Sequence, residues 1–233
     1  MTDIASKVKG GIQIDFHVHS RYSIDSLLSP RRIIEAAKNR GLSGVAVTDH
    51  DTIRGGIETL KLAKDEEDFI VIAGAEIKTN IGDLIGIFLE QEIKSREFFQ
   101  VANEIKQQGG IVILPHPYKT FYSLDSLDSK VINSIDLIEG FNARVKSNAL
   151  NLKAQEFALK RGKPITGGSD AHFVHEIGNG VTLFGNTPLE QDAIREALLK
   201  GKVEVRGSIL PLTLYALYEF GIGQALKFAK SRK

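Results

Sequence analysis

The sequence contains no cysteine, no tryptophan and one methionine, and its acidic and basic residues nearly balance. Without cysteine the chain has no disulfide, no thiolate metal ligand and no cysteine nucleophile, so nitrogen and oxygen atoms must hold any metal ion. The 30 Lys and Arg residues against 29 Asp and Glu residues give a formal charge of +1. The chain therefore lacks the basic excess expected of a dedicated nucleic-acid coat or clamp.

Long apolar runs are also missing. No stretch reaches the ~18 uninterrupted apolar residues of a transmembrane helix, and residues 1–11 lack the apolar core of a signal peptide. The most apolar tail, residues 209–220, is interrupted by Pro211 and Glu219. We therefore expect a cytoplasmic protein without a membrane anchor. A C-terminal helix at about 210–231 would pack on the body of the domain or on a second subunit of a homo-oligomer.

Short apolar, β-branched segments alternate with segments of helical periodicity. The expected strands are 12–16, 44–48, 69–76, 83–89, 111–115, 135–140, 164–169 and 203–205. This βαβα rhythm predicts a parallel sheet or barrel. No linker, repeat or low-complexity tract divides the 233 residues. We therefore expect a single α/β domain over residues 1–233, folded as one barrel.

Capping residues mark several of the expected helices. Ser29 and Pro30 begin one helix. Thr187 and Glu190 predict a capping box at the start of another. A third helix, expected within 146–161, has the spacing of a buried face at Leu150, Ala154, Phe157 and Ala158.

Five of the six histidines follow directly on an expected strand. They are His17, His19, His50, His116 and His172. In a parallel barrel the loops after the strands meet at one face, where the active site lies. Three of these histidines lie within two residues of an aspartate. The pattern indicates a shared metal centre rather than five separate structural residues.

The individual clusters differ in strength. His17 and His19 lie two residues apart at a strand end, so both side chains point to one side and can share an ion. Asp170 and His172 repeat this spacing after a later strand. Glu76 ends a very apolar run, where an unpaired carboxylate would be costly, so either a metal ion or a salt bridge is needed to explain it.

Two further clusters are weaker when taken alone. Asp49 and Asp51 flank His50, and capping of a turn is the alternative role for both aspartates. His116 stands between two prolines, whose rigid, extended backbone would aim the imidazole.

The ordered set HVHS, TDHD, AGAE, PHP and SDAH spans residues 15–172 and resembles the motif set of the PHP (polymerase and histidinol phosphatase) phosphoesterase family. The resemblance implies a distorted (β/α)7, TIM-like barrel with two or three divalent metal ions. It also implies the ligands of each ion: His17, His19, Glu76 and Asp170 for the first, Glu76 and His116 for the second, and His50 and His172 for the third.

The chain departs from the family pattern after the first histidine pair. Many relatives carry H-S-x-x-S-D-G, whose aspartate is a ligand of the third ion, whereas this chain reads HSRYSIDS and moves the acid to Asp25. Either the loop shifts by one residue and delivers Asp25, or the third site is weakened. We expect delivery. Nitrogen and oxygen ligands suit zinc, manganese or iron more than magnesium.

Hydrolysis of a phosphate ester by metal-activated water is the expected reaction. The substrate would be a phosphorylated metabolite, a nucleotide or the end of an oligonucleotide. We assign Arg144 and Asp49 to catalysis, and Arg144, Asn142 and Arg54 to binding of the substrate. Arg21 is a further candidate, and a solvated surface position is the alternative for each arginine.

Two other classes of protein fit part of the pattern. An amidohydrolase-type metal hydrolase would share the first histidine pair and the late aspartate, but usually holds its bridging site with a modified lysine or another carboxylate. A non-catalytic barrel subunit of a ribonucleoprotein would be expected to lose metal ligands, and the full set is retained here.

Overall fold

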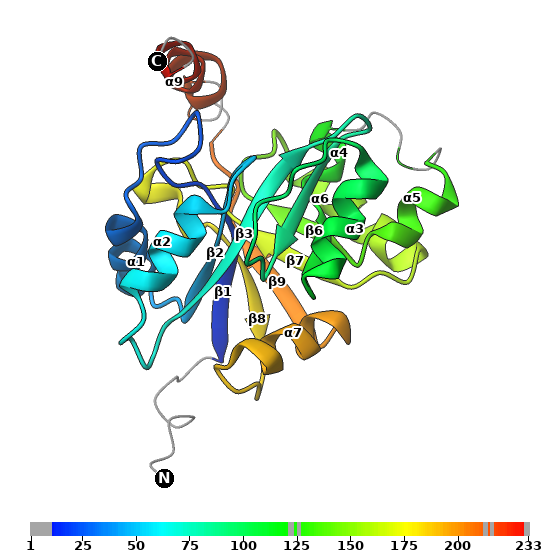
Figure 1. The fold of residues 1–233 in the computed structure, drawn as a ribbon, viewed down its shortest axis with the longest axis horizontal. Helices are drawn as coiled ribbons and strands as arrows, with labels where there is room; N and C mark the ends of the chain where they lie inside the picture. Colours follow the sequence, from blue (N-terminus) through cyan, green and yellow to red (C-terminus); the bar gives the residue numbers. More distant parts are fainter. Residues whose placement is uncertain (1–10, 121–123, 125–126, 212–213, 215–216, 231–233) are drawn as a thin grey trace.

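The computed structural model describes residues 11–120, 124, 127–211, 214 and 217–230. Within these residues nine strands form one mixed sheet that curls into a nearly closed barrel (Figure 1). The sheet order is β7-β6-β5-β4-β3-β2-β1-β8-β9. The strands are β1 (Ile12–Val18), β2 (Gly44–His50), β3 (Ile70–Lys78), β4 (Asp83–Ile87), β5 (Ile111–Leu114), β6 (Leu137–Asn142), β7 (Ile165–Gly168), β8 (Gly180–Phe184) and β9 (Val203–Gly207).

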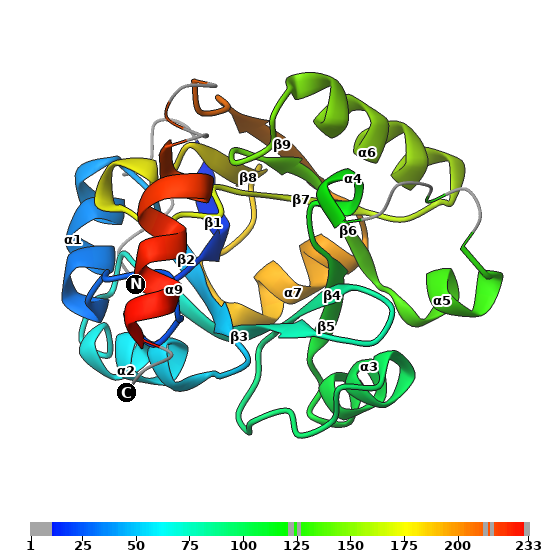
Figure 2. The same ribbon diagram turned by 90° about the horizontal axis from the view of Figure 1, so that it is seen from above.

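Helices surround the sheet and close its lower end. Figure 2 shows α1 and α2 on one side of the barrel and α3, α5 and α6 on the other. Helix α7 lies below the barrel in Figure 1 and packs Ile194, Ala197 and Leu198 against the apolar core between the strands. The helices are α1 (Pro30–Asn39), α2 (Arg54–Leu62), α3 (Phe98–Gln107), α4 (Pro117–Thr120), α5 (Ser129–Ser134), α6 (Asn148–Lys160), η2 (Val174–Glu176), α7 (Gln191–Leu199), η3 (Leu217–Ile222) and α9 (Gly223–Lys230).

The barrel closes where β7 contacts β1, β8 and β9. Val18, the last residue of β1, forms a parallel bridge with Ala171. Gly180 permits the close approach of β7 and β8, because a Cβ atom there would lie 2.1 Å from the carbonyl oxygen of Gly168. The ends of β1 and β7 therefore lie side by side, although more than a hundred residues separate them in the sequence.

The sheet is mixed, which differs from the wholly parallel arrangement that the βαβα rhythm predicts. Strand β4 runs antiparallel to β3 and β5, and β8 runs antiparallel to β1 and β9. Only residues 79–82 connect β3 to β4. So short a link cannot contain the crossover that parallel neighbours need. The sequence analysis also missed β8, although its five residues make it no shorter than β5 and β7, which the pattern did reveal.

One predicted helix start is confirmed and another is wrong. The Ser29 hydroxyl accepts the N–H of Arg32, and Pro30 follows at the start of α1. Thr187 and Glu190, both of which the structure describes, do not form the predicted capping box. Glu190 is itself the extended residue before α7, with φ −135° and ψ 143°, so it cannot serve as a residue of the first helical turn.

The buried face of α6 also differs by one residue from the prediction. Ala154, Phe157 and Ala158 are buried as expected, but Leu150 is only partly buried and Asn151 takes the inner position. The Asn151 side chain accepts the backbone N–H of Asn142 and donates to the carbonyl oxygen of the same residue. These two hydrogen bonds satisfy the buried amide and tie α6 to the end of β6.

The C-terminal helix expected at about 210–231 consists of η3 and α9, while residues 212–213, 215–216 and 231 lie outside the described part. Helix α9 lies above the end of the barrel at which β1 and β2 finish (Figure 1). No helix among the described residues is long and apolar enough to cross a membrane.

Candidate metal centre

Four buried side chains meet where β1, β3 and β7 bring their carboxyl-terminal ends together. The Nε2 atoms of His17 and His19 lie 3.0 Å apart. Oε2 of Glu76 lies 3.3 Å from the first nitrogen and 3.4 Å from the second. Oδ1 of Asp170 lies 3.7 and 3.4 Å from the same two atoms. These are the four residues that the family resemblance implies for a first ion.

A second group of potential ligands extends from Glu76 to His116. The two residues approach to 2.9 Å between His116 Nε2 and Glu76 Oε1. Glu139 of β6 joins them: its Oε1 lies 3.0 Å from His17 Nδ1, and its Oε2 accepts the N–H of His116. The atoms of His17, His116 and Glu139 are close enough together to hold an ion. The sequence analysis missed Glu139, although an acid inside the apolar strand IDLIEG was a signal for it.

The third group contains Asp25. Its Oδ1 lies 3.2 Å from His172 Nε2 and its Oδ2 lies 3.4 Å from His50 Nε2. With His19, these residues form a third cluster able to hold an ion. The loop after β1 thus brings the displaced acid to the two histidines. Burial acts to raise the pKa of Asp25, but the adjacent imidazoles hold it well below its usual value.

Asp49 shapes the loop that carries Asp25 and does not line the pocket. Its carboxylate accepts the backbone N–H and the hydroxyl of Ser20, at 2.5 and 2.7 Å, and the hydroxyl of Ser23 at 3.1 Å. Asp49 therefore positions this loop, and the catalytic role that the sequence analysis gave it stays a prediction.

The predicted substrate-binding residues fall in three different environments. Arg144 is buried and lines the pocket. Asn142 is buried beneath it, and its side-chain amide donates to Oε2 of Glu139 and Oδ2 of Asp170. Arg54 lies outside the pocket lining, with its guanidinium 4.9 Å from the ring of Tyr22. Arg54 therefore does not lie with Arg144 and Asn142 at the pocket.

Burial and neighbouring charges shift the pKa values of the histidines and carboxylates in the centre. Burial acts first to lower the pKa of His17, but the carboxylates of Glu139, Asp170 and Glu76 outweigh it and hold that pKa well above its usual value. The pKa of His19 is held well below its usual value by burial and by the neighbouring histidines. Burial acts to raise the pKa values of Glu76 and Asp170, but neighbouring positive charges outweigh it and hold both pKa values well below their usual values.

Backbone strain occurs at two of these residues. His116 has φ +26° and Asp170 has φ +55°, both in the left-handed region that residues with a Cβ seldom adopt. Such strain costs of order 1–3 kcal/mol per residue and persists where the surrounding structure imposes it, commonly at functional sites. The strained backbone aims both side chains inward.

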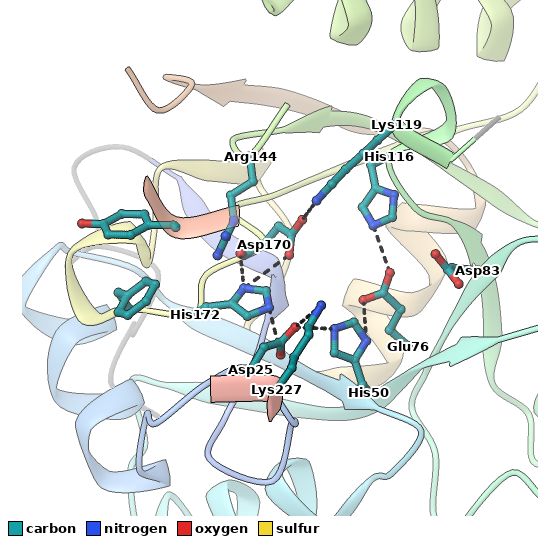
Figure 3. A pocket seen from close by; sticks show the side chains of 12 residues that line it. Asp25, His50, Glu76, Asp83, His116, Lys119, Arg144, Asp170, His172 and Lys227 are labelled. Carbon is teal, nitrogen blue, oxygen red and sulfur yellow. Dashed lines mark hydrogen bonds and ion pairs between the residues drawn. The ribbon is translucent and has the colours of Figure 1, made fainter. Parts of the chain in front are cut away.

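The centre lies at the bottom of a pocket of about 340 Å³ (Figure 3). Three cations reach this pocket: Arg144, Lys119 and Lys227. Lys119 Nζ lies 3.3 Å from Asp170 Oδ2, and Lys227 Nζ lies 3.2 Å from Asp25 Oδ2. The sequence analysis identified neither lysine. Lys119 lies two residues after the PHP motif, and Lys227 comes from a segment without a motif. It also missed three other lining residues: Asp83, Phe173 and Tyr218.

Comparison with family models gives two matches. The model described as PHP domain matches residues 15–162, and the model described as PHP-associated matches residues 148–203. The chain belongs to the PHP domain family. The family resemblance drawn from the motifs is confirmed, and with it the metal-binding character of a PHP phosphoesterase domain.

Three curated relatives share segments of different length with this chain. An uncharacterized protein of Methanocaldococcus jannaschii is 38% identical over 161 residues, which cover 64% of this chain and 92% of that protein. A second uncharacterized protein of the same organism is 32% identical and covers 77% of this chain and 73% of its own length. A shorter match, 41% identical over 66 residues, is to a 5'-3' exoribonuclease of Haemophilus influenzae, of which it covers 23%.

Solved structures confirm the barrel fold. A two-domain protein from Bacteroides vulgatus that contains a predicted PHP-like metal-dependent phosphoesterase superposes with a TM-score of 0.71 at 21% identity. The match covers 84% of this chain and 65% of that one, so this chain spans slightly less than two thirds of the larger protein. An amidohydrolase from Chromobacterium violaceum with bound sulfate superposes with a TM-score of 0.59 at 16% identity, covering 82% and 97% of the two chains.

The residues present fit divalent metal ions. Imidazole nitrogens and carboxylate oxygens face one another at 3.0–3.7 Å in a buried space. Uncompensated burial of several carboxylates would be costly. Nitrogen and oxygen donor atoms at these separations can coordinate a shared divalent cation.

Proposed function

We propose that this PHP domain is a phosphoric ester hydrolase that acts on a phosphorylated metabolite, a nucleotide or the end of an oligonucleotide. The observation that carries the proposal is that three potential ion sites lie at one pocket whose lining also contains the cations Arg144 and Lys119. Metal ligands alone are compatible with many hydrolases. Cationic side chains in the pocket lining can form charge-assisted hydrogen bonds with an anionic substrate.

Zinc, manganese or iron would be held by the residues that the sequence and the geometry both single out, with Glu139 added. The proposed ligands are His17, His19, Asp25, His50, Glu76, His116, Glu139, Asp170 and His172. The chemistry that bound ions supply is activation of water and neutralisation of the charge that develops on the phosphate.

The remaining residues of the chain would bind and orient the substrate. Arg144 presents a planar fork of N–H donors, which matches two phosphate oxygens at once. Lys119 contributes a point charge from the first turn after β5. Asn142 holds Glu139 and Asp170 in place through its side-chain amide, so it would act on the ligands rather than on the substrate.

The similarity to the Haemophilus influenzae exoribonuclease supports the inclusion of oligonucleotide ends among the substrates. That match covers only 28% of this chain, so it does not narrow the substrate to RNA. The small pocket favours a phosphate at the end of a molecule over one within a long polymer.

Metal analysis followed by hydrolysis of a generic aryl phosphate tests the proposal, with a monoester and a diester assayed in parallel. We expect two or three bound ions and metal-dependent release of phosphate. The variant with both His17→Ala and His19→Ala should lose one ion and all turnover, because both residues are proposed ligands of that ion. An active double variant would contradict the site. A panel of phosphorylated metabolites and short oligonucleotides would then identify the substrate class.

An amidohydrolase activity is the second candidate, because the amidohydrolase from Chromobacterium violaceum superposes on this chain with a TM-score of 0.59. At 16% identity that likeness concerns the fold. The cations around the pocket favour the phosphoesterase. Hydrolysis of amides but not of phosphate esters by the metal-loaded protein would reverse this preference.

A further inference from the structure

The C-terminal segment returns to the mouth of the pocket, far from the strand-end loops that supply the other site residues. Tyr218 and Lys227 both belong to the pocket lining. Figure 2 shows α9 lying across the strand-end face of the barrel, on the side of α1 and α2. The catalytic face is therefore partly covered by a helix that does not belong to the βα repeat.

Tyr218 anchors the beginning of this segment. Its ring centroid lies 4.5 Å from that of Phe173, and its hydroxyl lies 2.8 Å from Nε2 of His175. Tyr218 is 9% exposed and packs with Leu210 and Leu214 in a small apolar cluster. This contact fixes η3 against the loop after β7.

Lys230 anchors the end of the segment. Its ammonium group donates to the backbone carbonyl oxygens of Arg21, Ser23 and Ser26, at 3.1, 2.5 and 2.7 Å. An ammonium group has three donors, so these carbonyls use its full capacity. All three belong to the loop that carries Asp25. Helix α9 is thus tied to the same loop that completes the third ion cluster.

The docking of α9 also determines the position of Lys227. It lies three residues before Lys230 and shares its helix face. Its Nζ atom lies 3.2 Å from Oδ2 of Asp25, while 43% of its side chain is exposed. In Figure 3 Lys119 and Lys227 approach the pocket from opposite sides. Both end on a proposed ligand carboxylate, Asp170 for Lys119 and Asp25 for Lys227.

We propose that Lys227 is a substrate-binding residue that contacts the phosphate group, so that α9 is part of the active site. The inference rests on the proposed phosphoesterase function. An ammonium group held beside ions bound to Asp25 would be repelled by them unless an anion lay between the charges. A phosphate supplies such an anion. The flexible four-carbon stem of lysine lets Nζ move from Asp25 to a phosphate oxygen while Lys230 keeps the helix docked.

Calorimetric titration of the manganese-loaded protein with inorganic phosphate tests this role. We expect Lys227→Gln to raise the dissociation constant of phosphate by roughly tenfold, the low end for a charge-assisted contact because Lys227 is partly exposed. Lys227→Arg should stay within about threefold of the parent, a change below 0.7 kcal/mol. Lys153→Gln, at an exposed lysine of α6, is the matched control and should change nothing.

Hydrogen exchange of residues 217–230 separates a binding role from a packing role. In the parent, phosphate should slow exchange in this segment, because the ligand then bridges α9 to the metal centre. In Lys227→Gln this slowing should disappear while exchange without phosphate stays as in the parent.

An unchanged phosphate affinity in Lys227→Gln, especially with tighter metal binding, would overturn the assignment and make Lys227 a counter-ion of Asp25. No effect of phosphate on exchange in the parent would overturn it as well, even if the variant were poorly folded. Hydrolysis of an aryl phosphate by the parent is measured in parallel. An inactive parent that still binds phosphate through Lys227 would refute the proposed function and leave this assignment standing.

Discussion

At the scale of single residues, Asp25 shows how one displaced acid can still reach a metal centre. It stands one place away from the position common among relatives, yet its two oxygens lie beside His50 and His172. The Ser26 hydroxyl oxygen lies 2.9 and 3.1 Å from the carbonyl oxygens of His19 and His172, which share its single hydrogen, and so fixes the turn immediately after Asp25. These hydrogen bonds hold the loop in a conformation in which the displaced carboxylate still reaches the two histidines.

Replacement of Asp25 by alanine should therefore remove one equivalent of metal and leave the other ions bound. The remaining ligands of that cluster would be histidines alone, which bind the third ion more weakly. Elemental analysis of the dialysed protein measures the loss. Asp65→Ala, at an exposed acid far from the pocket, is the control. Metal content equal to that of the parent would leave the third ion to the histidines.

Arg144, the proposed phosphate-binding residue, also forms a buried ion pair. Its NH1 atom lies 3.4 Å from Oε2 of Glu176, and the arginine side chain is 4% exposed. The same Glu176 oxygen accepts the backbone N–H groups of His172 and Phe173. Glu176 thus links the arginine to the loop that carries a proposed metal ligand.

We expect Arg144→Ala to lower kcat/KM by roughly ten- to a hundredfold, because a charge-assisted contact to phosphate contributes about 1.5–3 kcal/mol. Arg144→Lys should retain only part of the parent kcat/KM, since lysine lacks the two-pronged donor geometry of arginine. The free energy of unfolding should also fall, by about 1–3 kcal/mol, because a buried partner of Glu176 is lost. Steady-state kinetics and urea unfolding measure the two effects.

Glu176→Gln is the matched comparison, because it weakens the ion pair and keeps the arginine. It should lower stability with a much smaller effect on kcat/KM. A loss of kcat/KM within about twofold in Arg144→Ala would instead assign Arg144 to structure and leave the phosphate to the metal ions and the lysines.

At the scale of elements, the loop between β1 and α1 is the part of the barrel on which the third cluster depends. Asp49, at the end of β2, holds its first residues through Ser20 and Ser23. Gly55 of α2 permits this contact, since a Cβ atom there would lie 1.9 Å from an Asp49 oxygen. The neighbouring strand and helix thus shape the loop.

Asp49→Ala should resemble Asp25→Ala in metal content, even though Asp49 does not line the pocket. The substitution leaves the N–H of Ser20 and two hydroxyls without their acceptor, which costs about 1–3 kcal/mol of stability for each buried group left unsatisfied. Metal analysis and urea unfolding report the two losses. Asp49→Asn keeps an acceptor and should recover part of both. Normal metal content in Asp49→Ala would show that the loop holds its shape without this carboxylate.

At the scale of the whole molecule, the metal centre joins segments that enclose most of the chain, from His17 to His172. Ions that bind the folded state and not the unfolded one stabilise the fold by mass action. The buried carboxylates add to this dependence, because the folded protein holds them close together whether or not an ion is bound.

Chelation should therefore lower the melting temperature. At a free ion concentration a hundred times the dissociation constant the stabilisation is about 2.7 kcal/mol, and each kcal/mol corresponds to about 2–4 °C for a chain of this size. We expect a decrease of roughly 5–10 °C in scanning calorimetry on addition of EDTA. The His17→Ala and His19→Ala double variant should show a much smaller response. Equal melting temperatures with and without EDTA in the parent would contradict ion binding at this centre.

The sequence predicted most strands and most site residues, and its failures have physical causes. The apolar pattern revealed every strand of the described residues except β8, and it could not give the direction of β4, which the brief connection to β3 imposes. The predicted capping box at Thr187 failed because tertiary packing of α7 against the barrel core places the helix start at Gln191. Asn151 replaced Leu150 inside α6 because the end of β6 needed hydrogen-bonding partners.

The sequence by itself determined the ligand chemistry: the absence of cysteine, the histidines and acids at strand ends, and their order along the chain. Only the tertiary structure decided which side chains share a site. Glu139 and Lys227 lie in segments without a motif, whereas Lys119 and Arg54 both lie beside a motif and only Lys119 lines the pocket. The reason is that strand-end position is a local property readable from the pattern, whereas convergence depends on barrel closure and on the docking of α9, which join residues far apart in the chain.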